Sequence, residues 1–189
     1  MSSKIAFISQ AFTLLGKGPI HSLEVTPQAQ TAAVLYDRIY PTLLTRTYWH
    51  FARKIGEELN LIDDVTGVDE WQYAYQLPVN ILQLYRLRPN VNYVIAEDKI
   101  YTNYKNLTNG FRIDYTYQIK ENKLPVYFQT ALVYTIAAEI AMPITQQTSL
   151  AKLWTQKARA ALSYAMWNDA SNSPSELIQS NPLWRAHFV

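Results

Sequence analysis

Cysteine is absent from this 189-residue sequence, and histidine occurs only three times. Without cysteine the chain can form no disulfide, no thiolate metal site and no cysteine nucleophile, which is consistent with folding in a reducing compartment. His21, His50 and His187 lie far apart and fit no spacing of metal ligands. We therefore predict that the protein has no metal site and no cofactor.

Charge is also scarce. Charged residues make up 17% of the chain and hydrophobic residues 49%, whereas an average soluble domain has roughly 25% charged residues. The net charge of +2 is too small for a dedicated nucleic-acid binder, whose affinity depends on many Lys and Arg contacts to phosphate. A surface with so little charge is typical of a protein that other subunits cover.

Long hydrophobic runs are missing as well. No apolar run reaches the roughly 18 residues that span a bilayer. The segment 1–10 lacks the basic start, apolar centre and small-residue cleavage site of a signal peptide. We expect a soluble, unsecreted protein with no membrane contact.

Apolar residues at helical spacing predict two helices near the N-terminus. The first covers about residues 5–15. The second begins at Thr26, whose hydroxyl can cap free N–H groups, and at Pro27, which is well suited to the first helical position. Its apolar stripe continues to Leu44, and we expect a kink or a break at Pro41 because proline removes a helical hydrogen bond.

The middle of the chain changes to a period of two. Residues 71–77 and 111–119 alternate between apolar and polar side chains, which predicts strands with one buried face. Residues 81–88 and 93–104 also look extended, and the second of these should turn at 97–99. The central region is therefore predicted to be β structure.

Helical spacing returns after Pro125 and ends at Pro143. A longer last helix follows, with its stripe over 150–165 and with alanines that allow another helix to approach closely. Neither helical half has enough apolar partners alone, so we expect the two halves to form one bundle.

The predicted fold class is α+β. The N- and C-terminal helices, residues 1–56 and 125–170, form a helical bundle, and residues 57–124 form a central antiparallel β insertion. Residues 171–189 follow as an extended C-terminal arm, because helical periodicity fails there.

The arm and two loops supply the candidate partner-binding residues. A solvated tail would not need large apolar side chains, yet the arm has several. The loops of the insertion should be free for contact. The candidates are Leu177, Ile178, Leu183, Trp184 and Phe188 in the arm, and Asp64 and Asp98 in the loops.

An acidic stretch is the first candidate for chemistry. It consists of Glu57, Glu58, Asp63, Asp64, Asp69 and Glu70. Such residues suit a calcium loop or a carboxylate pair for glycoside cleavage. The ligand alternation of a calcium loop is absent, because Val65 and Val68 occupy ligand positions. We interpret the stretch as a solvated acidic rim.

Glu139 is the second candidate, as a polar residue within the apolar run 132–142. A buried carboxylate without a partner is costly, so we expect it to pair with an Arg or Lys of the last helix rather than to act in catalysis. No catalytic residue is assigned.

Several short strings occur in a fairly specific order along the chain. They are Leu14-Leu15-Gly16, Pro19-Ile20, Ser22-Leu23-Glu24, Tyr36-Asp37, Trp49-His50-Phe51-Ala52, Tyr75-Gln76-Leu77-Pro78, Leu82, Asp114-Tyr115, Pro125, Phe128, Ala137-Ala138 and Pro143-Ile144-Thr145. In order and spacing, this set resembles the tail tubular protein A family, the head-to-tail adaptor ring of short-tailed bacteriophages. The likeness extends to about Asp169. One departure is Asn80, where such proteins often have an acidic residue.

The resemblance implies a structural virion protein and no enzyme. About twelve copies would form a homo-oligomeric ring that joins the portal protein to the tail nozzle protein, with DNA passing non-specifically through the centre. The bundle and the arm would face the portal, and the insertion would face the tail. The protein would be assembled in the host cytoplasm and located in the tail or neck of the virion.

Two alternatives remain open. A peptidoglycan-degrading tail enzyme would use Glu139 or the acidic stretch as its carboxylates. A head-completion connector of a long-tailed phage would also be helical and ring-forming but would receive a different tail. Cell-wall clearing by the purified protein would identify the enzyme, and the neighbouring tail gene would identify the connector.

Overall fold

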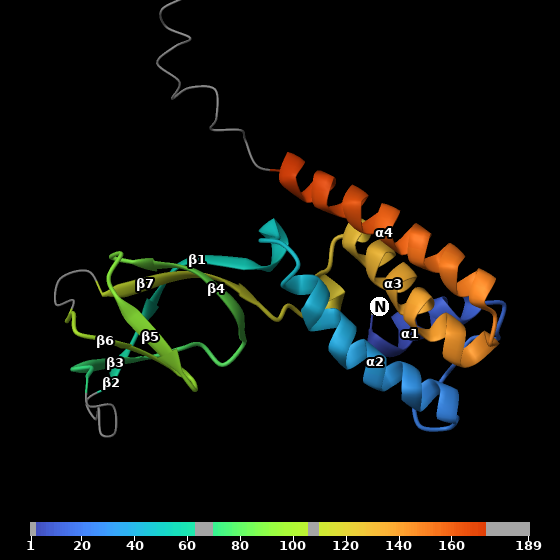
Figure 1. Cartoon of the computed structure of the whole chain (residues 1–189), viewed down its shortest axis with the longest axis horizontal. Helices are drawn as coiled ribbons and strands as arrows, with labels where there is room; N and C mark the ends of the chain where they lie inside the picture. The colour runs from blue at the N-terminus through green and yellow to red at the C-terminus, as the bar shows by residue number, and fades with distance from the viewer. Residues whose placement is uncertain (1–2, 63–69, 106–109, 173–189) are drawn as a thin grey trace, which may run out of the picture.

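The computed structural model describes residues 3–62, 70–105 and 110–172 (Figure 1). Its helices are α1 (Lys4–Leu14), α2 (Pro27–Leu44), α3 (Val126–Thr145) and α4 (Thr148–Ser171), and its strands lie between α2 and α3 in the sequence. The helices gather at one end of an elongated molecule and the strands at the other. The predicted α+β class is confirmed.

The two N-terminal helices begin at side-chain caps. Ser3 Oγ accepts a hydrogen bond from the backbone N–H of Ala6 at 3.4 Å, and Thr26 Oγ1 accepts one from the N–H of Ala29 at 3.2 Å. Pro27 follows Thr26 at the first helical position. The start predicted for the second helix is therefore confirmed, with the hydroxyl satisfying one of the free N–H groups.

Of the kink or break predicted at Pro41, the break is wrong, because α2 continues to Leu44. Proline removes only its own N–H bond, and just three helical residues follow it. Two of them, Leu43 and Leu44, are buried in the helical core, and the Pro41 carbonyl still accepts a bond from the N–H of Thr45 at 3.0 Å. Tertiary packing thus outweighs the lost hydrogen bond.

Helix α3 is the centre of the bundle and packs against α1, α2 and α4. Its side chains Phe128, Leu132, Ile136 and Ile140 are fully buried. The helix ends at Thr145 rather than at the predicted Pro143, because Gln146 with a φ of 56° forms a left-handed cap. The N–H of this residue donates to the carbonyl of Met142 at 3.0 Å, so the cap and not the proline sets the end.

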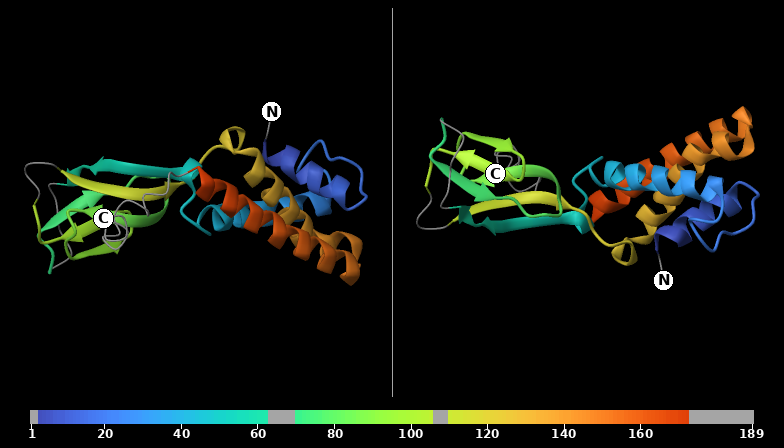
Figure 2. Two further views of the ribbon diagram at one scale, coloured as in Figure 1. Left: turned by 90° about the horizontal axis from the view of Figure 1, so that it is seen from above. Right: turned by 90° about the horizontal axis from the view of Figure 1, so that it is seen from below.

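The strands form two antiparallel sheets (Figure 2). The three-stranded sheet has the order β1 (Arg53–Leu59), β7 (Phe111–Tyr117), β4 (Ile81–Arg88). The four-stranded sheet has the order β2 (Leu61–Ile62), β3 (Tyr73–Gln76), β6 (Lys99–Thr102), β5 (Tyr93–Ala96). A second hydrophobic core, separate from that of the helices, contains Leu59, Tyr75, Leu77, Leu87, Ile100, Phe111, Ile113 and Tyr115.

Several strand predictions need correction. β1 begins at Arg53, four residues before the predicted start of the insertion, and β3 is shorter than the predicted strand 71–77. Asp114 and Thr116 on β7 are buried although alternation predicts them to be exposed. β7 is the central strand of its sheet, and Asp114 accepts hydrogen bonds from the N–H of Gly56 at 2.8 Å and from Arg88. These partners make its burial tolerable.

Two tyrosines of α2 hold the segment between β7 and α3. The hydroxyl of Tyr40 donates to the carbonyl of Ile119, and the hydroxyl of Tyr36 donates to Glu121 Oε1 at 3.3 Å. Among the described residues no helix is long and apolar enough to cross a membrane.

Candidate functional site

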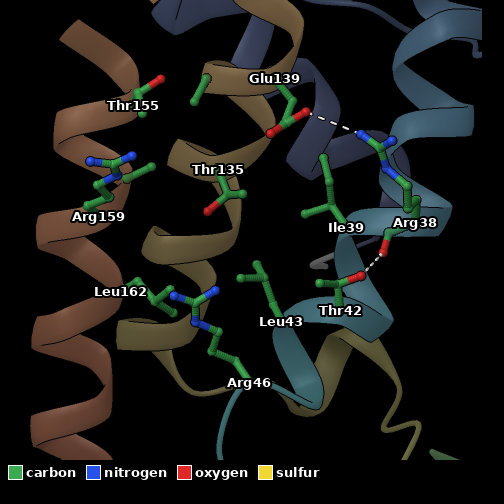
Figure 3. Close-up of a pocket in the computed structure, with 12 residues that line it drawn as sticks. Arg38, Ile39, Thr42, Leu43, Arg46, Thr135, Glu139, Thr155, Arg159 and Leu162 are labelled. Carbon is green, nitrogen blue, oxygen red and sulfur yellow. Dashed lines mark hydrogen bonds and ion pairs between the residues drawn. The ribbon is translucent and has the colours of Figure 1, made fainter. Parts of the chain in front are cut away.

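A groove runs between α2 and α4, with α3 as its floor (Figure 3). Its volume is about 560 Å³. Ile39 and Leu43 form one apolar wall and Leu162 the other. The groove exists because α2 and α4 both pack on α3. We refer to it as the arginine groove, because three arginines line it.

The three arginines are Arg38 on α2, Arg46 just after α2, and Arg159 on α4. Arg38 forms an ion pair with Glu139 at 3.2 Å, and this pair is drawn as a dashed line in Figure 3. The guanidinium groups of Arg46 and Arg159 make no ion pair or hydrogen bond with any of the described residues. The lining therefore holds three guanidinium groups and one carboxylate, which leaves two unpaired positive charges.

The partner of Glu139 differs from the prediction, which placed it on the last helix. The observed partner, Arg38, belongs to α2. The Glu139 carboxylate also lies at the exposed rim of the groove and not in the core. An ion pair in such an exposed place contributes about 0–1 kcal/mol. The Arg38–Glu139 pair therefore contributes little to the stability of the fold.

A second open surface lies where α4 and α1 flank α3. It contains two hollows of about 520 and 310 Å³ that share Val126 and Thr130. Ala161, Tyr164 and Asn168 of α4 line the smaller hollow. None of the described residues that line either hollow carries a charge.

Two large aromatic side chains are exposed at this surface. Tyr164 is 61% exposed and Trp167 is 64% exposed, and their rings stack with centroids 6.3 Å apart. We call the surface formed by Val126, Thr130, Ala161, Tyr164 and Asn168, together with the adjoining Trp167, the neutral flank. Exposed aromatic groups of this size are typical of protein interfaces.

A buried carboxylate fixes the end of α4. Asp169 is only 3% exposed. Its Oδ2 accepts from the backbone N–H of His50 at 2.8 Å and lies 2.9 Å from His50 Nδ1, and its Oδ1 accepts from the hydroxyl of Tyr127 at 2.8 Å. Burial and the bond to Asp169 raise the pKa of Tyr127. The cluster joins α4 to the turn at His50–Ala52 and to the start of α3.

Sequence reasoning missed this cluster. The three residues belong to different elements, and Asp169 is separated by 119 residues from His50 and by 42 from Tyr127. The only available signal was that Asp169 is the single acidic residue of the last helix.

Of the seven predicted partner-binding residues, only Asp98 lies in the described part of the chain. It occupies the turn between β5 and β6 and is exposed. Its Oδ2 accepts from Gln76 Nε2 at 2.8 Å, a bond that lowers the pKa of the carboxyl group, and its carbonyl accepts from the N–H of Leu77. The turn at 97–99 is confirmed, and Asp98 also ties this hairpin to β3.

The remaining six candidates lie outside the described residues. They are Asp64, Leu177, Ile178, Leu183, Trp184 and Phe188.

The acidic stretch is partly a strand. Glu57 belongs to β1, where it accepts from Lys54 Nζ and from the Tyr115 hydroxyl, both at 2.8 Å. Among the described residues no three His, Cys, Asp or Glu side chains are grouped so that they could hold a metal ion. The Glu57 carboxylate therefore has structural partners, and the described residues form no shared metal site.

No known family model matches the chain, and no curated protein is detectably similar to it.

Proposed function

We propose that this chain is a structural virion protein. It acts as an adaptor-ring subunit that joins the portal to the tail nozzle of a short-tailed phage and lines the DNA exit channel. The observation that carries this proposal is the presence of two separate hydrophobic cores at opposite ends of an elongated chain (Figure 1). A subunit of this shape can bind one partner at each end while copies of it pack side by side.

The two ends suit different partners. The bundle offers two open surfaces, and residues 173–189 follow it in the sequence, so we assign it to the portal and to neighbouring copies. The sheets end in hairpin turns such as that at Asp98, and we assign these turns to the contact with the tail nozzle. In a head-to-tail ring each copy uses two different surfaces, and closure of the rotation at about twelve copies stops growth.

The charge distribution is compatible with non-specific passage of DNA. Residues 1–52 and 118–172 contain nine Lys or Arg and five Asp or Glu, a net charge of +4. Residues 53–117 contain seven Lys or Arg and nine Asp or Glu, a net charge of −2. Tight binding needs many clustered phosphate contacts, and charges this sparse and mixed would let DNA slide past.

Electron microscopy of the protein mixed with its portal tests the proposal. We expect a ring attached to the base of the portal, at the position where the neck of the virion forms. Cell-wall clearing by the purified protein, lost in Glu139→Gln, would instead support the enzymatic alternative. A protein that neither binds the portal nor forms a ring would contradict the proposal.

A further inference from the structure

The two open surfaces of the bundle lie on opposite sides of α4. Leu162 lines the arginine groove and Tyr164 lines the neutral flank. With 3.6 residues per turn, side chains two positions apart are separated by about 200° around the helix axis, so they point to nearly opposite sides. Figure 3 shows Arg159 and Leu162 on the side of α4 that faces the groove. One helix therefore separates two surfaces that face away from each other, as a head-to-tail contact requires.

The chemistry of the two surfaces is complementary. The groove contributes Arg46 and Arg159, whose guanidinium groups have no partner among the described residues. The neutral flank contributes the exposed rings of Tyr164 and Trp167. Guanidinium groups stack favourably on such rings, and Trp, Tyr and Arg are the residue types that dominate binding energy in protein interfaces. The apolar walls of the groove can cover the rest of the inserted surface.

A second copy of this chain fits both surfaces better than a different partner does. The helical part of each copy has a net charge of +4, so two copies repel each other unless the contact uses a surface without cations. The neutral flank is such a surface. DNA or an acidic protein would neutralise the arginines of the groove but would leave the aromatic flank exposed. Each copy of this chain brings one surface of each kind.

We infer that the neutral flank of one copy inserts into the arginine groove of the next copy, with Tyr164 and Trp167 stacked on Arg46 and Arg159. This inference rests on the proposed ring and names the lateral contact between its subunits. The same contact, repeated around the ring, covers both open surfaces of every helical bundle.

Cysteine cross-linking in the full chain tests this contact, because the protein has no cysteine of its own. One chain carries Ala161→Cys on the neutral flank and a second carries Thr155→Cys in the groove. The two are mixed with a short bismaleimide. In the matched control, the second chain carries Val34→Cys instead, at a valine of α2 that is 70% exposed and lines neither surface.

We expect the 161–155 heterodimer to exceed the 161–34 control by roughly tenfold, which corresponds to about 1.4 kcal/mol. Adding Tyr164→Glu and Trp167→Glu to the Ala161→Cys chain should reduce the yield to the control level. Gln156→Glu in the same Ala161→Cys chain, an exposed substitution outside the neutral flank, should leave the yield unchanged. Circular dichroism confirms that each variant is folded.

Two results overturn the inference. Predominant 161–161 dimers would show that the neutral flank pairs with itself. Yields at the control level for every pair would show that copies do not meet through these surfaces. A ring seen on the portal together with control-level cross-linking would leave the proposed function standing and would place the lateral contact elsewhere. Absence of any ring would count against the proposed function itself.

Discussion

Replacing Asp169 with alanine tests how the end of α4 is held. In the folded protein this buried carboxylate accepts two hydrogen bonds of 2.8 Å, one from the backbone N–H of His50 and one from the Tyr127 hydroxyl. Alanine removes both acceptor oxygens and leaves the two donors in a part-buried position. The substitution should therefore destabilise the helical bundle much more than a surface change does.

The magnitude follows from the two donors left without an acceptor. Each buried donor without a partner costs about 1–3 kcal/mol. Both hydrogen bonds are only part-buried, so water can reach the donors and the lower half of the combined range applies. We expect a loss of roughly 3 kcal/mol. For a chain of this length, that loss lowers Tm by roughly 6–12 °C. Tyr127→Phe removes only one donor and should cost about 1–2 kcal/mol.

Thermal and urea unfolding followed by far-UV circular dichroism measure the effect. Asp37→Ala is the matched control, because Asp37 pairs with Lys4 at 2.7 Å but is 65% exposed, and its loss should stay within about 0.5 kcal/mol. If Asp169→Ala were no more destabilising than Asp37→Ala, the buried cluster would not hold the end of α4, and this reasoning would be refuted.

Three further predictions concern the core, the sheets and the arm. Leu132→Ala in the centre of α3 should cost about 2–5 kcal/mol in urea unfolding, because the side chain is fully buried. Burial and the bond to Glu57 raise the pKa of Tyr115 to about 12, whereas an unfolded tyrosine titrates near 10, so this contribution to stability should be complete below about pH 10 and lost as pH rises toward 12. Tyr115→Phe should flatten this alkaline decline, and an unchanged profile would show that other tyrosines dominate it. A chain that ends at Asn172 should keep its Tm but lose binding to the portal in sedimentation, and unimpaired binding would reject a role for the arm.

The helices were predictable because their signals are local. The cap at Thr26 and the apolar stripes can be read from neighbouring residues. Proline was misleading at positions 41 and 143, because both lie within a few residues of a helix end where packed side chains outweigh one lost bond. Local signals therefore locate a helix but do not set its last residues when tertiary contacts compete.

The first strands were not predictable in the same way. β1 carries four charged residues in seven, and the side chain of Glu57 is held by Lys54 and Tyr115 rather than by an apolar core. Such a strand shows no alternation of apolar residues. Its pairing with β7 depends on residues more than 50 positions away in the sequence.

The candidate surfaces depend even more on packing. Periodicity showed that Glu139 was an unusual residue, but it did not tell which neighbouring helix would supply its partner. The arginine groove joins residues of α2, α3 and α4, and the neutral flank joins residues of α3 and α4. Neither surface exists until the helices pack on α3.

Imaging the complex of this protein with its portal tests the central claim most directly. The account predicts a closed ring of about twelve copies beneath the portal, with the helical bundles against the portal and the two-sheet ends pointing toward the nozzle. A portal without any bound ring, or a ring whose sheets and not its helices contact the portal, would contradict it.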